Sequence, residues 1–151
     1  MIRIKRNYRV AQKVERLFDV AADFESYPEF LPNCLAMRVI EQTDENFLVD
    51  NLYRWGPVTT QFRSRTHMER PHRLDVKSVD RGTQFSIGWR FVPDGPEATQ
   101  VTFTMEVDLN NRLLRGVVEA VLQTTAQRIE SAFRARVDQI FGGTGSSSTE
   151  I

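Results

Sequence analysis

Side chains able to do nucleophilic, acid–base or metal chemistry are few in this 151-residue sequence. It has a single cysteine, Cys34, and two histidines, His67 and His72. It contains no Gly-x-Ser-x-Gly nucleophile motif, no phosphate-binding glycine loop and no His-Glu-x-x-His metal motif. Glu106 and Asp108 share the polar face of one alternating segment, and His67 lies on the polar face of another, so none of them forms an acid–base pair inside a cavity. The sequence therefore predicts a protein that is not an enzyme.

Composition and charge exclude several further classes of protein and site. Twenty Lys and Arg residues balance twenty Asp and Glu residues, which argues against a protein that coats nucleic acid. One cysteine excludes an intrachain disulfide, and one cysteine with two histidines is a poor structural zinc site. No apolar run approaches the roughly 20 residues of a membrane span, and the charged start of the chain lacks the apolar core of a signal peptide. We expect one domain, a cytoplasmic location, and no metal or cofactor.

Hydrophobic periodicity divides the chain into elements, because period-two alternation predicts strands and 3.6-residue spacing predicts helices. The expected strands cover residues 2–9, 35–41, 46–54, 58–69, 72–80, 83–92 and 98–109, and the expected long helices cover 12–23 and 111–141. A second, short helix is expected from Ser26, which has capping-box spacing to Glu29, as far as Pro32. The Gly- and Ser-rich residues 143–151 are expected to form a flexible tail on a domain of residues 1–142.

The last helix has apolar residues at helical spacing over about 40 Å, with Asn111 as its candidate N-cap and Gly142 as its stop. It needs a broad apolar surface, which the strands supply because one face of each is apolar. We expect an α+β fold: a curved antiparallel sheet of about six to seven strands wrapped around the C-terminal helix. A bent sheet cannot touch a straight helix along its whole length. The gap is either filled by side chains or left for a ligand.

Several sequence blocks carry a family resemblance. They are Leu17-Phe18-Asp19-Val20-Ala21-Ala22-Asp23, Tyr27-Pro28-Glu29-Phe30-Leu31-Pro32-Asn33-Cys34, Trp89-Arg90-Phe91-Val92-Pro93 and Ala132-Phe133-Arg134-Ala135-Arg136. Over residues 2–142 the chain resembles the START-like family of coenzyme Q-binding proteins, which includes the bacterial ribosome association toxin RatA. The family often has a tryptophan where this chain has Asn33.

The resemblance implies a helix-grip fold with a hydrophobic pocket. It also implies binding of ubiquinone or a similar isoprenoid lipid, as a carrier or chaperone that supports respiratory electron transport; ubiquinone would be a bound ligand, not a cofactor. Phe30 and Pro32 are candidate pocket residues from the family block. The inward faces of the sheet and the long helix add the other candidates: Phe62, Phe85, Trp89, Phe91, Phe103, Met105, Val117, Val121 and Leu122.

Two alternatives stay open. Residues 1–16 carry a local charge of +5, so Arg3, Lys5, Arg6 and Arg9 are candidate contacts with anionic lipid at the inner membrane or with the phosphates of ribosomal RNA. The second function is accordingly a RatA-like regulator of translation that associates with the ribosome. Trp55, at a predicted loop tip, is a candidate membrane contact. The third function is a polyketide cyclase or dehydratase, because some relatives with this fold are such enzymes.

Overall fold

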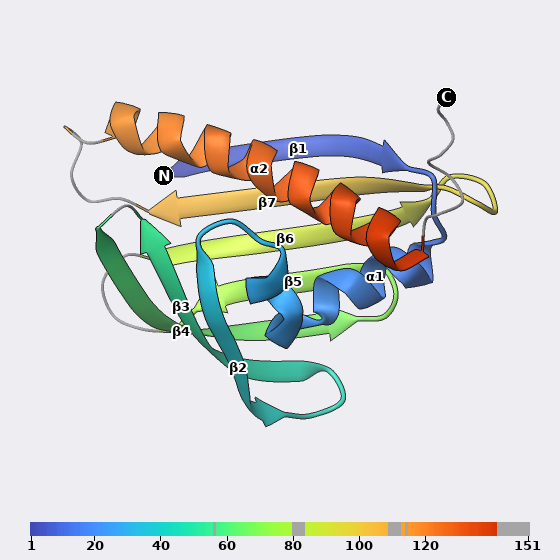
Figure 1. Ribbon diagram of the computed structural model, residues 1–151, viewed down its shortest axis with the longest axis horizontal. Helices are drawn as coiled ribbons and strands as arrows, with labels where there is room; N and C mark the ends of the chain where they lie inside the picture. Colours follow the sequence, from blue (N-terminus) through green and yellow to red (C-terminus); the bar gives the residue numbers. More distant parts are fainter. Residues whose placement is uncertain (56, 80–83, 109–112, 114, 142–151) are drawn as a thin grey trace.

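The structure is a computed structural model that describes residues 1–55, 57–79, 84–108, 113 and 115–141, without the side chains of Trp55 and Val58. A seven-stranded antiparallel sheet has the order β1-β7-β6-β5-β4-β3-β2. The strands are β1 (Ile2–Val10), β2 (Cys34–Gln42), β3 (Asn46–Trp55), β4 (Val58–Glu69), β5 (Arg73–Ser78), β6 (Gln84–Pro93) and β7 (Thr99–Asp108). Figure 1 shows α2 (Arg115–Phe141) crossing one face of this curved sheet. The expected α+β helix-grip architecture is confirmed.

The strands form where the sequence alternates. In β7 the odd-numbered side chains from Val101 to Val107 are buried, and the intervening ones are at least partly exposed. Neighbouring strands put apolar residues at the same level, as in the pairing of Trp89 with Phe103 between β6 and β7. This repeated in–out alternation gives the sheet one apolar face, which lies toward α2, and one polar face on the other side.

Two short helices follow β1. Helix α1 (Val14–Ala22) buries Leu17 and Phe18, and η1 (Phe24–Glu29) is a 3-10 helix. The prediction that this second helix starts at Ser26 with a capping box is wrong, since η1 already begins at Phe24. The hydroxyl of Ser26 instead donates to the Asp23 carboxylate, 2.7 Å away.

Asn33 makes the turn from η1 into β2. Its φ of 68° lies in the left-handed region, which asparagine tolerates better than bulky residues do. Its side-chain amide donates to the Arg54 carbonyl at 2.8 Å, and the Arg54 amide donates back to the Asn33 carbonyl at 2.9 Å. Asn33 therefore suits this turn both by its tolerance of the left-handed conformation and by the hydrogen bond of its side chain.

Helix α2 packs on the rest of the protein mainly from Thr125 onward, where Ala126, Phe133 and Val137 are buried. From Arg115 to Thr124 no side chain is buried. In Figure 1, α2 runs obliquely from the β1 edge of the sheet to α1, so its ends are held differently. This agrees with the expectation that a bent sheet does not touch the straight helix along its whole length. The predicted N-cap of α2, Asn111, and its predicted stop, Gly142, lie outside the described residues. The same holds for the expected tail at 143–151.

Candidate functional site

A cavity of about 520 Å³ lies between the apolar face of the sheet and α2. Its walls come from η1, from strands β2 to β7, from the residues after η1 and from the middle of α2. The volume lies within the range of about 300–1,000 Å³ that is typical of small-molecule sites. The sequence predicted a gap between the sheet and the helix that is either filled by side chains or left for a ligand. In the structure this gap is open space.

Seven of the eleven predicted pocket residues line this cavity: Pro32, Phe62, Phe85, Trp89, Phe103, Met105 and Leu122. Aromatic rings organise the wall. Phe62 meets Phe85 edge-to-face with centroids 4.9 Å apart and stacks on Tyr53 at 5.8 Å. Trp89 meets Phe103 at 4.8 Å and the α2 residue Phe133 at 4.9 Å. This second cluster closes the space toward the well-packed end of α2.

Four predicted pocket residues lie elsewhere. Phe91 is completely buried behind the cavity, between Trp89 and Phe18. Phe30 packs between Tyr27 and the guanidinium of Arg136 and does not reach the cavity wall.

Val117 and Val121 were placed by helical spacing on the face of α2 that should meet the sheet. They are 65% and 51% exposed, because the first half of α2 does not descend onto the strands. Leu122, one position further, is the α2 residue of this region that turns into the cavity. Helical spacing identified the apolar residues of α2 correctly. Which of them line the cavity depends on the rotation of α2 about its axis and on its distance from the sheet.

A polar patch inside the cavity was not predicted as a site. Asn51, Ser64, Thr66 and Ser78 line the cavity and are all buried. The Asn51 amide donates to Ser64 Oγ at 3.0 Å and to the Val49 carbonyl at 3.1 Å, which fixes both side chains. The available signal was weak: small polar residues at inward positions of residues 58–69. Asn51 and Ser78 already have hydrogen-bond partners within the protein, so the hydroxyls of Ser64 and Thr66 are the groups of this patch that suit the polar end of a ligand.

The titratable groups on the described cavity wall are two tyrosines, Tyr27 and Tyr53. Burial raises the pKa of Tyr53 well above its usual value, and nearby Cys34 raises it further. Burial likewise raises the pKa of Tyr27, whose hydroxyl donates to the Ala21 carbonyl. Both phenols are therefore neutral at pH 7. Burial also raises the pKa of Cys34, which keeps its thiol protonated and a poor nucleophile.

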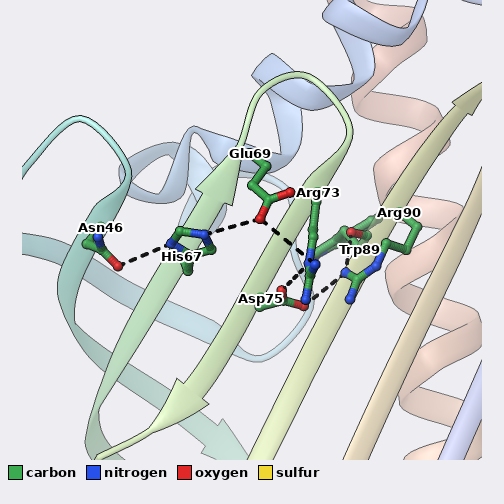
Figure 2. Close-up of polar contacts among 7 residues, drawn as sticks. All are labelled: Asn46, His67, Glu69, Arg73, Asp75, Trp89 and Arg90. Carbon is green, nitrogen blue, oxygen red and sulfur yellow. Dashed lines mark hydrogen bonds and ion pairs between the residues drawn. The ribbon is translucent and has the colours of Figure 1, made fainter.

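The polar face of the sheet holds the other candidate acid–base residues. His67 lies there between Asn46 and Glu69, with ring nitrogens 3.4 Å from an oxygen of each (Figure 2). Within the described residues, no group of three or more His, Cys, Asp or Glu side chains is placed to hold a metal ion.

The basic N-terminal segment is largely ion-paired. Arg6 meets Glu130 of α2 at 2.6 Å, Arg9 meets Asp94 at 2.8 Å, and Arg3 meets Glu106 at 3.3 Å. Acidic residues far away in the sequence therefore neutralise part of the local +5 charge of residues 1–16, and the contacts predicted for Arg3, Lys5, Arg6 and Arg9 stay predictions. The membrane contact predicted for the Trp55 side chain lies outside the described residues. No helix in the described part of the chain has the length and hydropathy to cross a membrane.

Comparisons with known proteins agree with this geometry. The family described as polyketide cyclase / dehydrase and lipid transport matches residues 10–134. The ribosome association toxin RatA of Escherichia coli K12 is 25% identical over 142 residues, which cover 93% of this chain and 90% of the relative.

Solved structures support the fold. A START superfamily protein from Mycobacterium smegmatis superimposes with a TM-score of 0.81 at 15% identity, covering 91% of this chain and 98% of the other. The Zhui aromatase/cyclase from Streptomyces sp. R1128 gives a TM-score of 0.80 at 15% identity, covering 95% and 98%. With a family match over most of its length, the chain belongs to the polyketide cyclase / dehydrase and lipid transport family.

Proposed function

We propose that this protein binds a hydrophobic small molecule with a polar end, and that the ligand is ubiquinone or a similar isoprenoid quinone. The observation that carries the proposal is the cavity: about 520 Å³ of apolar-walled space with a fixed polar patch inside it. A site of this kind is matched by a molecule that is mostly hydrocarbon and has a few oxygen atoms at one end.

The polar patch suits the ring of a quinone. Quinone carbonyls accept hydrogen bonds, and Ser64 and Thr66 supply hydroxyl donors in a buried setting. Asn51 donates to Ser64 Oγ, which leaves the Ser64 proton for another acceptor. Phe62, Phe85 and Trp89 supply flat apolar surfaces for the ring itself.

The apolar wall suits an isoprenoid tail. Each buried methylene contributes about 0.8 kcal/mol, so a few isoprene units give useful affinity. The cavity is too small for a long polyisoprenoid chain, and the exposed apolar residues Val117 and Val121 lie beside Leu122 on α2. We infer that the tail leaves along this half of α2, and that the protein carries the quinone near the inner membrane in support of respiratory electron transport. The proposal is one of binding and carriage, without catalysis.

Solvent extraction and mass spectrometry of the purified protein test the ligand class. We expect a copurifying isoprenoid quinone, and saturable binding of a short-tail ubiquinone to the extracted protein. The Thr66→Val variant keeps side-chain volume and removes one hydroxyl, so it should weaken quinone binding about 2- to 10-fold. Thr104→Val, on β7 and on the polar face of the sheet, is the matched control and should bind normally. A protein that neither copurifies with an isoprenoid nor binds one contradicts the proposal.

We propose association with the ribosome as the second candidate function. Its support is the 25% identity to RatA over 93% of this chain. Salt-dependent cosedimentation of the protein with purified ribosomal subunits tests it. Absence of cosedimentation at low salt contradicts it.

A further inference from the structure

A second concavity, of about 670 Å³, lies on the polar face of the sheet, opposite the ligand cavity. Strands β1, β3, β4, β5, β6 and β7 contribute its lining. The charged side chains that line it are Arg3, Lys5, Arg65, Arg73, Lys77 and Arg90 on the positive side, and Asp75 and Glu106 on the negative side. We call this concavity the cationic groove. It has an excess of four positive charges on a chain with no net charge.

One pair of like charges in the groove is neutralised within the protein. Arg73 and Arg90 are direct cross-strand partners on β5 and β6. Asp75 lies between them, 2.6 Å from Arg73 and 2.9 Å from Arg90, as Figure 2 shows. Like charges directly opposite each other destabilise a sheet, and the shared carboxylate removes that cost here.

A second pair of like charges has no such carboxylate. Arg65 and Lys77 are direct cross-strand partners on β4 and β5, and both side chains are exposed. Within the described part of the chain neither makes an ion pair, and the same is true of Lys5 on the far side of the groove. In the free protein only solvent and salt screen the repulsion between Arg65 and Lys77, so an anionic partner that contacts both would relieve it further.

Gly88 keeps the middle of the groove open. It lies on β6, opposite Asp75 on one side and Thr104 on the other. A Cβ atom there would make only ordinary contacts, 3.6 Å from Arg90 and 3.6 Å from Asp75, so packing does not require glycine. Glycine inside a strand weakens the strand, and one reason for it is the close approach of another molecule's backbone.

We propose that the cationic groove binds the phosphodiester backbone of RNA, with Arg65, Lys77 and Lys5 as phosphate contacts. Arg and Lys side chains neutralise phosphates, and hydroxyl and amide side chains such as Thr104 and Asn46 suit the sugar 2′-hydroxyls. A hollow fits the projecting phosphate ridge of RNA better than the broad surface of a membrane. The inference deepens the second candidate function, on which it rests, by naming the surface of contact, and it is independent of the ligand cavity.

Salt-dependent binding of a fluorescein-labelled RNA hairpin tests the groove. The double variant Arg65→Gln/Lys77→Gln should bind about tenfold more weakly at physiological salt, with a shallower dependence of log K on log salt. Arg9→Gln/Lys13→Gln removes the same charge from outside the groove lining, at residues paired with Asp94 and Glu97, and should change neither quantity. The groove variant should also keep or raise its Tm, because it removes a repulsion. A purely structural role for Arg65 and Lys77 would lower the Tm.

Equal loss of RNA binding in the two double variants overturns the assignment, because only net charge would matter. Failure of the hairpin to bind overturns it too, as does binding to phosphatidylglycerol vesicles in place of RNA. Cosedimentation of the groove variant with ribosomal subunits at unchanged affinity overturns the groove and leaves ribosome association standing. Loss of cosedimentation in the groove variant alone supports both.

Discussion

Replacing Leu122 by Trp tests which face of α2 contacts the ligand. Leu122 turns into the cavity, whereas its neighbour Val121 is 51% exposed and outside the cavity wall. A tryptophan side chain has about six more non-hydrogen atoms than a leucine side chain, so Leu122→Trp fills part of the space that a ligand tail would use. Excluding even three methylenes of the ligand costs about 2.4 kcal/mol, or a Kd about 60-fold higher.

Val121→Trp is the matched control, since it adds a comparable ring to the same helical turn on the outer side. We expect it to leave the Kd within about threefold of the parent. Displacement of Nile red by a short-tail ubiquinone gives the Kd of each variant, and Nile red alone reports whether the cavity takes any hydrophobic guest. We also expect Leu122→Trp to unfold at a urea concentration equal to or above that of the parent, because filling a cavity commonly adds about 0.5–2 kcal/mol.

Equal Kd values in both variants would refute the placement of the site against Leu122. The same conclusion would follow if Val121→Trp alone weakened binding. In that case α2 would present the face that helical spacing by itself indicates, and the ligand would lie between Val117, Val121 and the sheet.

Further predictions concern packing and protonation. Within the described residues the Tyr8 hydroxyl is the buried side-chain polar atom without a hydrogen-bond partner, so Tyr8→Phe should raise the free energy of unfolding by about 1 kcal/mol; a loss of that size in urea unfolding would mean that the hydroxyl is bonded. Phe133 is 1% exposed and packs against Trp89, so Phe133→Ala should lower the free energy of unfolding by about 3–5 kcal/mol. Ile140→Ala, at a half-exposed position of the same helix, should lower it by less than about 1 kcal/mol. Equal losses in urea unfolding would show that α2 is not anchored through Phe133. Burial raises the pKa of Cys34, so its thiolate fraction at pH 8 is small and alkylation by iodoacetamide should be slow in the native protein and fast in urea; equal rates would contradict a buried thiol.

The strand pattern of this protein could be read from the sequence, because in–out alternation is a local property of the chain. The segment 58–69 coincides with β4, and the odd-numbered residues of β6 and β7 are the apolar-facing ones. The order of elements, with hairpin-length connections, then leaves few topologies other than an antiparallel sheet with a terminal helix. The family blocks narrowed the choice to the helix-grip fold.

The composition of the site could be predicted only in part. Phe62, Phe85, Trp89, Phe103 and Met105 were found because a residue's strand face is fixed by its position in the alternation. Asn51 and Ser78 were not, since a small polar residue on an inward position gives no pattern until the strands are brought together. Arg3, Arg6 and Arg9 formed a charge cluster in the sequence, but the structure supplied their partners from β7, α2 and the loop before β7.

The sequence alone determined which residues are apolar, how they alternate and how long the last helix can be. The tertiary structure decided how far that helix stands off the sheet, and therefore that Leu122 faces the cavity while Val117 and Val121 do not. Helical spacing fixes the angle between residues on one helix but not the rotation or height of the helix over its neighbours. Those are set by packing at Phe133 and Val137, several turns away from the site.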